Sequence, residues 1–92
     1  MKIWYNNALE AERFIADVAG NRIRIGRGVG NDIVLKSPYV AEEAAVLTRR
    51  GDRWELLALG LNGCEVNESR LWQGDRLALD GSEKIKLFPF TL

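Results

Sequence analysis

The most informative segment of this chain runs Ile25-Gly26-Arg27-Gly28-Val29-Gly30-Asn31-Asp32-Ile33-Val34-Leu35. It begins with the end of one apolar strand, passes through a loop rich in glycine, and enters a second short apolar strand after Asn-Asp. The glycines spell GxGxG, but no helix is expected after them, which argues against a dinucleotide-binding turn. The segment therefore predicts a strand, a loop and a second strand.

Short segments typical of strands lie on both sides of this unit. In residues 22–25 arginine alternates with isoleucine, and in residues 84–87 lysine alternates with isoleucine and leucine, so each segment should have one buried and one exposed face. Residues 53–59 are apolar on both faces, as expected of a central strand. Further strands are expected at residues 2–5, 13–18, 32–35, 45–48, 64–66, 76–79 and 84–90. We predict an all-β fold, a two-sheet antiparallel β-sandwich of about nine to eleven short strands.

Two stretches have the composition of helices, because alanine and glutamate are good helix formers. They cover residues 7–16 and 41–46. We expect residues 8–12 to form a hairpin connection instead, and residues 40–45 to form an irregular turn before the next strand. Almost no helix is therefore predicted.

Length and composition exclude several classes of protein. The chain has 92 residues, 47% of them hydrophobic and 28% charged, with thirteen basic and thirteen acidic side chains. We expect one globular domain over residues 1–92, and the strand expected at its end is compatible with a domain excised from a longer protein. A zero net charge argues against nucleic acid as partner. No signal peptide or membrane-inserting segment is expected, and we predict a cytoplasmic location.

The sequence offers little for catalysis or metal binding. It has no histidine, which removes the commonest general base and metal ligand, and its aspartates lie mostly at turns. The single cysteine, Cys64, cannot form an internal disulfide and is expected to pack as a small apolar residue. We therefore predict no enzyme activity, no metal site and no cofactor.

Three patches in a fixed order resemble the forkhead-associated (FHA) family over nearly the whole chain, which implies an FHA/SMAD-like sandwich. Gly26-Arg27 with the loop and strand after it resembles the opening signature of that family. Residues 38–46 lie where the family has Val-Ser-x-x-His-Ala. The third patch resembles the family's Asn-Gly-Thr-x-Val-Asn and Gly-Asp-x-Leu segments; it is Leu61-Asn62-Gly63-Cys64-Glu65-Val66-Asn67, followed by Gly74-Asp75 and Leu77.

The resemblance implies that loops at one end of the sandwich hold a phosphothreonine peptide. Arg27 would contact the phosphate, and Asn62, followed by Gly63, would fix the peptide backbone. The chain departs from the family at three positions: Ala41 replaces the serine that donates to the phosphate, Ala44 replaces the bracing histidine, and Leu61 stands where serine or threonine is usual. The site residues implied by the resemblance are Arg27, Ala41, Glu42, Leu61, Asn62 and Gly63.

These departures lead to three hypotheses. The first is a protein-protein interaction module of FHA type that needs no phosphate, because Ala41 and Ala44 remove a donor and its support, and because the carboxylates of Glu42 and Glu43 would oppose a dianion. The second is phosphothreonine-peptide binding through Arg27 and Asn62, with Ser37 or Lys36 as substitute donors. The third is an architectural or self-assembly role through exposed sheet edges or the Glu42/Glu43 loop.

Two side chains near this site carry further expectations. Arg27 is expected to form an internal ion pair with Glu42 or Glu43, which would occupy its guanidinium, although an exposed pair contributes only about 0 to 1 kcal/mol. Tyr39 is the aromatic residue most open to exposure in this region, and we expect it to pack against the edge of the sandwich.

Overall fold

The computed structural model describes residues 2–9 and 12–92, and within them the chain forms eleven strands and no helix. This confirms the all-β prediction; residues 41–44, which have the composition of a helix, form an irregular loop. No helix in the described residues is long and apolar enough to cross a membrane. The strands are β1 (Lys2–Asn7), β2 (Glu12–Asp17), β3 (Arg22–Gly26), β4 (Ile33–Val34), β5 (Ala45–Arg50), β6 (Arg53–Ala58), β7 (Cys64–Val66), β8 (Ser69–Leu71), β9 (Arg76–Leu79), β10 (Ile85–Leu87) and β11 (Phe90–Thr91).

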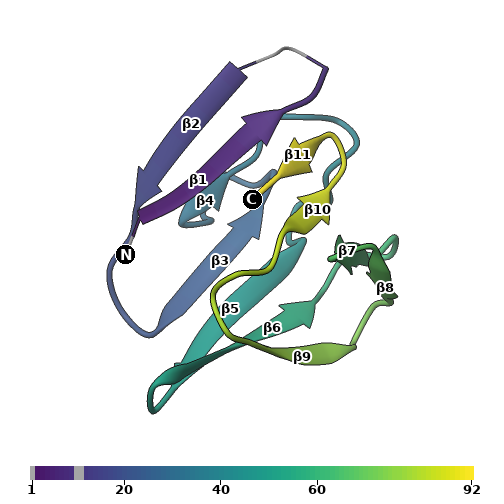
Figure 1. The fold of residues 1–92 in the computed structure, drawn as a ribbon. Coiled ribbons are helices and arrows are strands. Elements are labelled where there is room, and N and C mark those ends of the chain that lie inside the picture. The colour runs from purple at the N-terminus through teal and green to yellow at the C-terminus, as the bar shows by residue number, and fades with distance from the viewer. Residues whose placement is uncertain (1, 10–11) are drawn as a thin grey trace.

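The strands form two sheets, as predicted. One has the order β2-β1-β11-β10-β7-β8 and the other β4-β3-β5-β6-β9. In Figure 1 β2 lies at the outer edge beside β1, and the first strands of the chain lie next to the last two. Since β6 has a partner on each side, the expectation that residues 53–59 hold an internal strand is confirmed.

One strand pair departs from the predicted antiparallel arrangement, because β4 runs parallel to β3. Asp32 explains how the loop after β3 brings the chain back alongside that strand. The N–H of Asp32 donates to the carbonyl of Arg24 at 2.9 Å, and its carboxylate accepts the N–H of Arg24 at 2.8 Å. These bonds fix the chain beside β3 before β4 begins.

The core lies between the sheets and follows the alternation read from the sequence. Ile23 and Ile25 of β3 are fully buried while the alternating Arg22 and Arg24 are exposed. Ile85 and Leu87 of β10 are buried on either side of an exposed lysine. Burying one such aliphatic side chain contributes about 1.5–3 kcal/mol. Leu56 of β6 is also fully buried and joins the same cluster.

Aromatic contacts attach β1 and β2 to this core. The rings of Tyr5 and Phe14 are stacked with their centroids 5.0 Å apart, and Tyr5 also contacts Phe90 of β11 at 6.2 Å. Each such pair contributes about 0.5–1.5 kcal/mol beyond the area that it buries. The hairpin of β1 and β2 is therefore held by its inner face.

Two features near the C-terminus differ from prediction. Strand β8 was not expected; it is paired with β7 across a two-residue turn in which Asn67 and Glu68 both have positive φ, 49° and 72°. Residues 84–90 were expected as one strand but form β10 and β11, with Phe88 and Pro89 between them. Proline has no N–H for the ladder, so the strand cannot continue through it.

Candidate functional site

The loops after β3 and after β4 are joined by main-chain hydrogen bonds at one end of the sandwich. The N–H of Arg27 donates to the carbonyl of Ala41 at 3.0 Å, and that of Gly28 to the carbonyl of Glu42 at 3.1 Å. The side-chain amide of Asn31 donates to the carbonyls of Gly28 and Glu42, both at 2.8 Å. The two loops are thereby held together as one unit.

Arg27 does not form the ion pair expected from the sequence. Its Nε donates to the carbonyl of Val40 at 3.0 Å, and no ion pair among the described residues includes Arg27. The expectation is wrong because the main chain of Glu42 faces the loop after β3, while the Glu42 side chain lies against Gly28. The Nη atoms of Arg27 thus make no hydrogen bond or ion pair with the described residues.

The loop after β6 places Asn62 at the same end of the sandwich. Gly63 has φ +63°, and a methyl group on it would fall on the carbonyl oxygen of Leu71, so this position requires glycine on two counts. Its N–H closes the turn by donating to the carbonyl of Gly60 at 3.0 Å. Asn62 is exposed and its side-chain amide bonds to no described residue, while Leu61 is 81% exposed.

Arg70 supports this loop from β8, a role that the sequence reasoning missed. Its Nη2 donates to the carbonyl of Asn62, and its Nη1 lies 3.5 Å from Oε1 of Glu65. The guanidinium also lies over the ring of Trp72, 5.2 Å from the centroid, in the geometry of a cation–π contact. Interpreting residues 64–71 as a hairpin would have predicted the contact between Arg70 and Glu65, because a hairpin places these two residues opposite each other.

The two alanines take different places in the site. Ala44 is buried, and its main chain links neighbouring segments: its N–H donates to Ile25, and its carbonyl accepts the N–H groups of Leu59 and Gly60. Ala41 is half-buried beside Arg27 and offers no side-chain donor. Loop support therefore comes from main-chain bonds at Ala44, where the resemblance implies a histidine.

The loops enclose an open depression of about 750 Å³, here called the loop groove. Five of the six expected site residues line it, and Glu42 does not; the five are Arg27, Ala41, Leu61, Asn62 and Gly63. Among the described residues its charged lining consists of three bases, Arg27, Arg70 and Lys86, and one carboxylate, Glu65. Within residues 2–9 and 12–92 no cluster of acidic, cysteine or histidine side chains could hold a metal ion.

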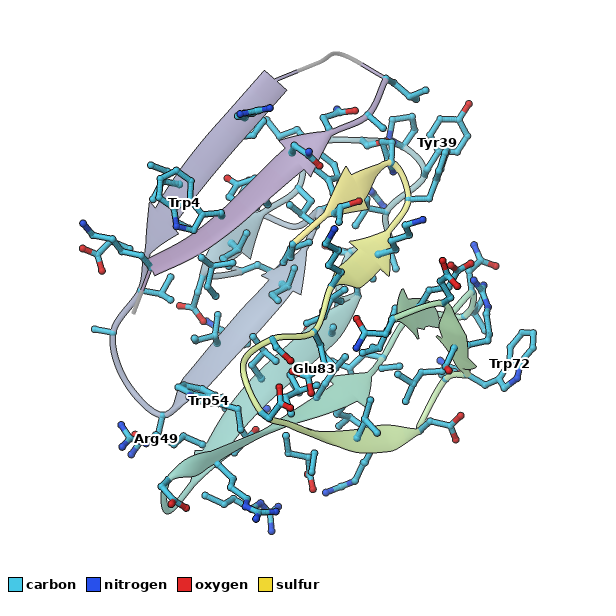
Figure 2. All side chains as sticks on the ribbon, in the orientation of Figure 1. Trp4, Tyr39, Arg49, Trp54, Trp72 and Glu83 are labelled. Atoms are coloured by element: carbon cyan, nitrogen blue, oxygen red, sulfur yellow. The ribbon has the colours of Figure 1, made fainter. Side chains whose placement is uncertain are left out.

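An aromatic pair borders the groove. Tyr39 and Phe88 are 62% and 61% exposed, and their rings meet edge to face with centroids 5.2 Å apart. The expectation that Tyr39 packs against the edge of the sandwich is therefore wrong for most of its side chain, which contacts Phe88 but stays largely in solvent (Figure 2). Ser37 is buried and its Oγ accepts the N–H of Tyr39 at 3.2 Å; neither it nor Lys36 lines the groove.

Cys64 begins β7 beneath this loop and is 1% exposed. Burial raises the pKa of its thiol above the ordinary value, and the positive charge of Arg70 opposes this only in part. A thiol kept in its protonated form is a poor nucleophile. The packing role expected for Cys64 agrees with this environment.

Comparison with known proteins identifies the fold. The family model described as FHA domain matches residues 23–87. A comparison with curated proteins finds no match.

Among solved structures, the chain is similar to EmbR of Mycobacterium tuberculosis, determined in complex with a low affinity phosphopeptide, with TM-score 0.76 and 24% identity over 96% of this chain and 22% of that chain. It is also similar to the Slr1951 protein of Synechocystis sp., with TM-score 0.80 and 18% identity over 98% and 92% of the two chains.

A third similar structure is the FHA domain of CT664 from Chlamydia trachomatis, with TM-score 0.74 and 19% identity over 99% and 93% of the two chains. The chain therefore spans about a fifth of EmbR but nearly all of the other two. The match of the family model, the sandwich and the loop groove lead to one conclusion: this chain belongs to the FHA family of phosphopeptide-binding protein-protein interaction modules.

Proposed function

We propose that this FHA domain binds an extended acidic segment of a partner protein in the loop groove and does not require a phosphate group. One observation carries the proposal. The Nη atoms of Arg27 are free of ion pairs with described residues, whereas the neighbouring Ala41 has no hydroxyl to donate. The anchor for an anion is present and its second donor is missing.

The number of donors favours a carboxylate over a phosphate. A guanidinium matches the two oxygens of a carboxylate in a bidentate pair, while a phosphothreonine carries about −1.5 to −2 charge on three oxygens and needs several convergent donors. The N–H groups of Arg27 and Gly28 are already bonded to the loop after β4 and add nothing. Glutamate or aspartate in the partner is therefore the better match to Arg27.

The rest of the groove suits an extended peptide. Lys86 and Arg70 extend the basic lining from Arg27 toward β7 and β8, and the exposed Tyr39 and Phe88 offer apolar surface at its border. The side-chain amide of Asn62, which bonds to no described residue, has both a donor and an acceptor for the peptide main chain. Apolar and acidic side chains at neighbouring positions of a partner segment would both find complementary surfaces.

A titration with three matched peptide pools tests this proposal. The pools differ at one central position, which is aspartate, threonine or phosphothreonine, and binding is followed by NMR shifts of the ¹⁵N-labelled chain. We expect the aspartate and phosphothreonine pools to shift the Arg27 and Asn62 amides with affinities within about threefold of each other, and the threonine pool to bind more weakly. Arg27→Ala should abolish these shifts, and Arg22→Ala, outside the groove, should not.

Ala41→Ser provides the sharpest control. Restoring a hydroxyl beside Arg27 should raise affinity more for the phosphothreonine pool than for the aspartate pool, because a phosphate bound to both Nη atoms has a third oxygen that still lacks a donor. The competing function is phosphothreonine recognition by the unmodified chain, favoured by Arg27 and Asn62 lining one groove. A phosphothreonine pool that binds the unmodified chain tenfold or more tightly than the aspartate pool would establish that function instead.

A further inference from the structure

Strand β2 is the longest edge of the two sheets. It has six residues, whereas the other edge strands, β4, β8 and β9, have two, three and four. Among the described residues no strand lies on its far side, as Figure 1 shows. An edge strand of this length presents N–H and C=O groups that can pair with another chain, and proteins commonly shorten or cover such edges.

The two faces of β2 differ in what they contact. Phe14 and Ala16 turn inward and pack against the core, so the strand is held in place from that side. Arg13, Ile15 and Asp17 are exposed on the outer face. The outer face therefore carries a positive charge, an aliphatic side chain and a negative charge in a row.

This row is complementary to itself. If two copies of β2 pair antiparallel with Ile15 opposite Ile15, the register places Arg13 of each copy opposite Asp17 of the other. Side chains opposite one another across antiparallel strands lie about 4.5–5.5 Å apart at Cβ, where opposite charges attract. A parallel pairing in register would instead place the two Arg13 side chains together, so the charges select the antiparallel arrangement.

An apolar strip adds to the same surface. Trp4 of β1 lies directly opposite Ile15, and the two side chains are 66% and 55% exposed. Figure 2 shows Trp4 on the strand beside β2. In the antiparallel pair the strip would continue from Trp4 and Ile15 of one copy to Ile15 and Trp4 of the other, since their outer faces lie on the same side of one joined sheet.

We propose that two copies of this chain associate through β2, which pairs antiparallel with itself about Ile15. The joined sheet then runs continuously through both copies, with two Arg13–Asp17 pairs flanking the apolar centre. No residue of β2 lines the loop groove, so both grooves remain open in the pair. The association is thus independent of the function proposed for the groove.

Charge reversal tests the register directly. Sedimentation velocity from micromolar to millimolar concentration should show a reversible monomer-dimer equilibrium for the unmodified chain. Arg13→Asp alone and Asp17→Arg alone should each weaken association by about tenfold or more, because two attractive pairs become repulsive. An equimolar mixture of the two variants should regain a dimer. Positions 13 and 17 are then both acidic in one copy and both basic in the other, so opposite charges again face each other.

Two controls distinguish a loss of association through β2 from unfolding and from association through another surface. Both substituted positions are exposed, so circular dichroism should show folded variants, and Arg22→Asp on β3 should associate like the unmodified chain. Ile15→Lys should abolish association by placing two like charges on the symmetry axis. A chain that is monomeric throughout the range, or a mixture no more associated than its components, would overturn the proposal.

Discussion

Replacing Gly63 by alanine should be among the most damaging single changes in the loops. An L-residue at φ +63° costs about 1–2 kcal/mol relative to glycine. The added methyl group also falls on the carbonyl oxygen of Leu71, which belongs to the rigid backbone of β8, and overpacking of this kind costs about 1–3 kcal/mol. The sum, about 2–5 kcal/mol, is a large part of the 5–15 kcal/mol typical of a whole domain.

Two other glycines separate these contributions. Gly51 has nearly the same φ, +65°, but no atom lies within 4 Å of an added methyl group, so Gly51→Ala should cost only about 1–2 kcal/mol. Gly30 has neither a positive φ nor a close neighbour, and Gly30→Ala should leave stability unchanged or raise it by up to about 1 kcal/mol. Urea unfolding followed by tryptophan fluorescence, to which the half-buried Trp54 contributes, gives all three values. Equal losses for the variants at 63 and 51 would refute the reasoning, because the contact with Leu71 would then contribute nothing.

Three further predictions concern the loops and the titrating groups. Asn31→Ala removes one hydrogen bond between the loops after β3 and β4, to Glu42, and one within the loop after β3, to Gly28. The change should cost about 1–3 kcal/mol in urea unfolding, with no loss if the loops are held by their main chains alone. Cys64 should react with Ellman's reagent only after addition of denaturant, and rapid reaction of the native chain would contradict its burial. Burial raises the pKa of Cys64 and of Tyr5 above their ordinary values of 9.0 and 10.0, so the unfolded chain loses these protons first and stability should fall as the pH rises above about 9. Unfolding curves at increasing pH measure this fall, and Cys64→Ala should remove its first part.

The sequence predicted the sandwich because its signals are local. In β3 and β10 charged and aliphatic residues alternate. Only a strand with one buried face places all the aliphatic side chains in the core and all the charged ones in water, and both segments form such strands. Strand β8 could not be predicted in the same way. The turn before it needs positive φ at two residues, which usually requires glycine at the second, and this chain has Glu68 there.

The sequence predicted only those residues of the candidate site that lie in the loops themselves. Arg27, Asn62 and Gly63 were found because they lie in the loops that form the groove. Arg70 was missed because its place depends on the hairpin of β7 and β8, which was not predicted. Phe88 was missed because it contacts Tyr39 from a distant part of the chain, which no local pattern records. The expected ion pair of Arg27 with Glu42 was wrong for a related reason. Glu42 does lie beside the loop after β3, but its main chain and not its carboxylate faces that loop.

The bonds that join the loops after β3 and β4 run through the main chain on the side of residues 41 and 42, whose carbonyls are the acceptors. The position of the loop is therefore largely independent of the side chains at 41, 42 and 43. Mutations there can exchange one recognition chemistry for another while the geometry around Arg27 stays the same. Such a site can change its partner over evolutionary time, or in a selection experiment, without first losing its fold.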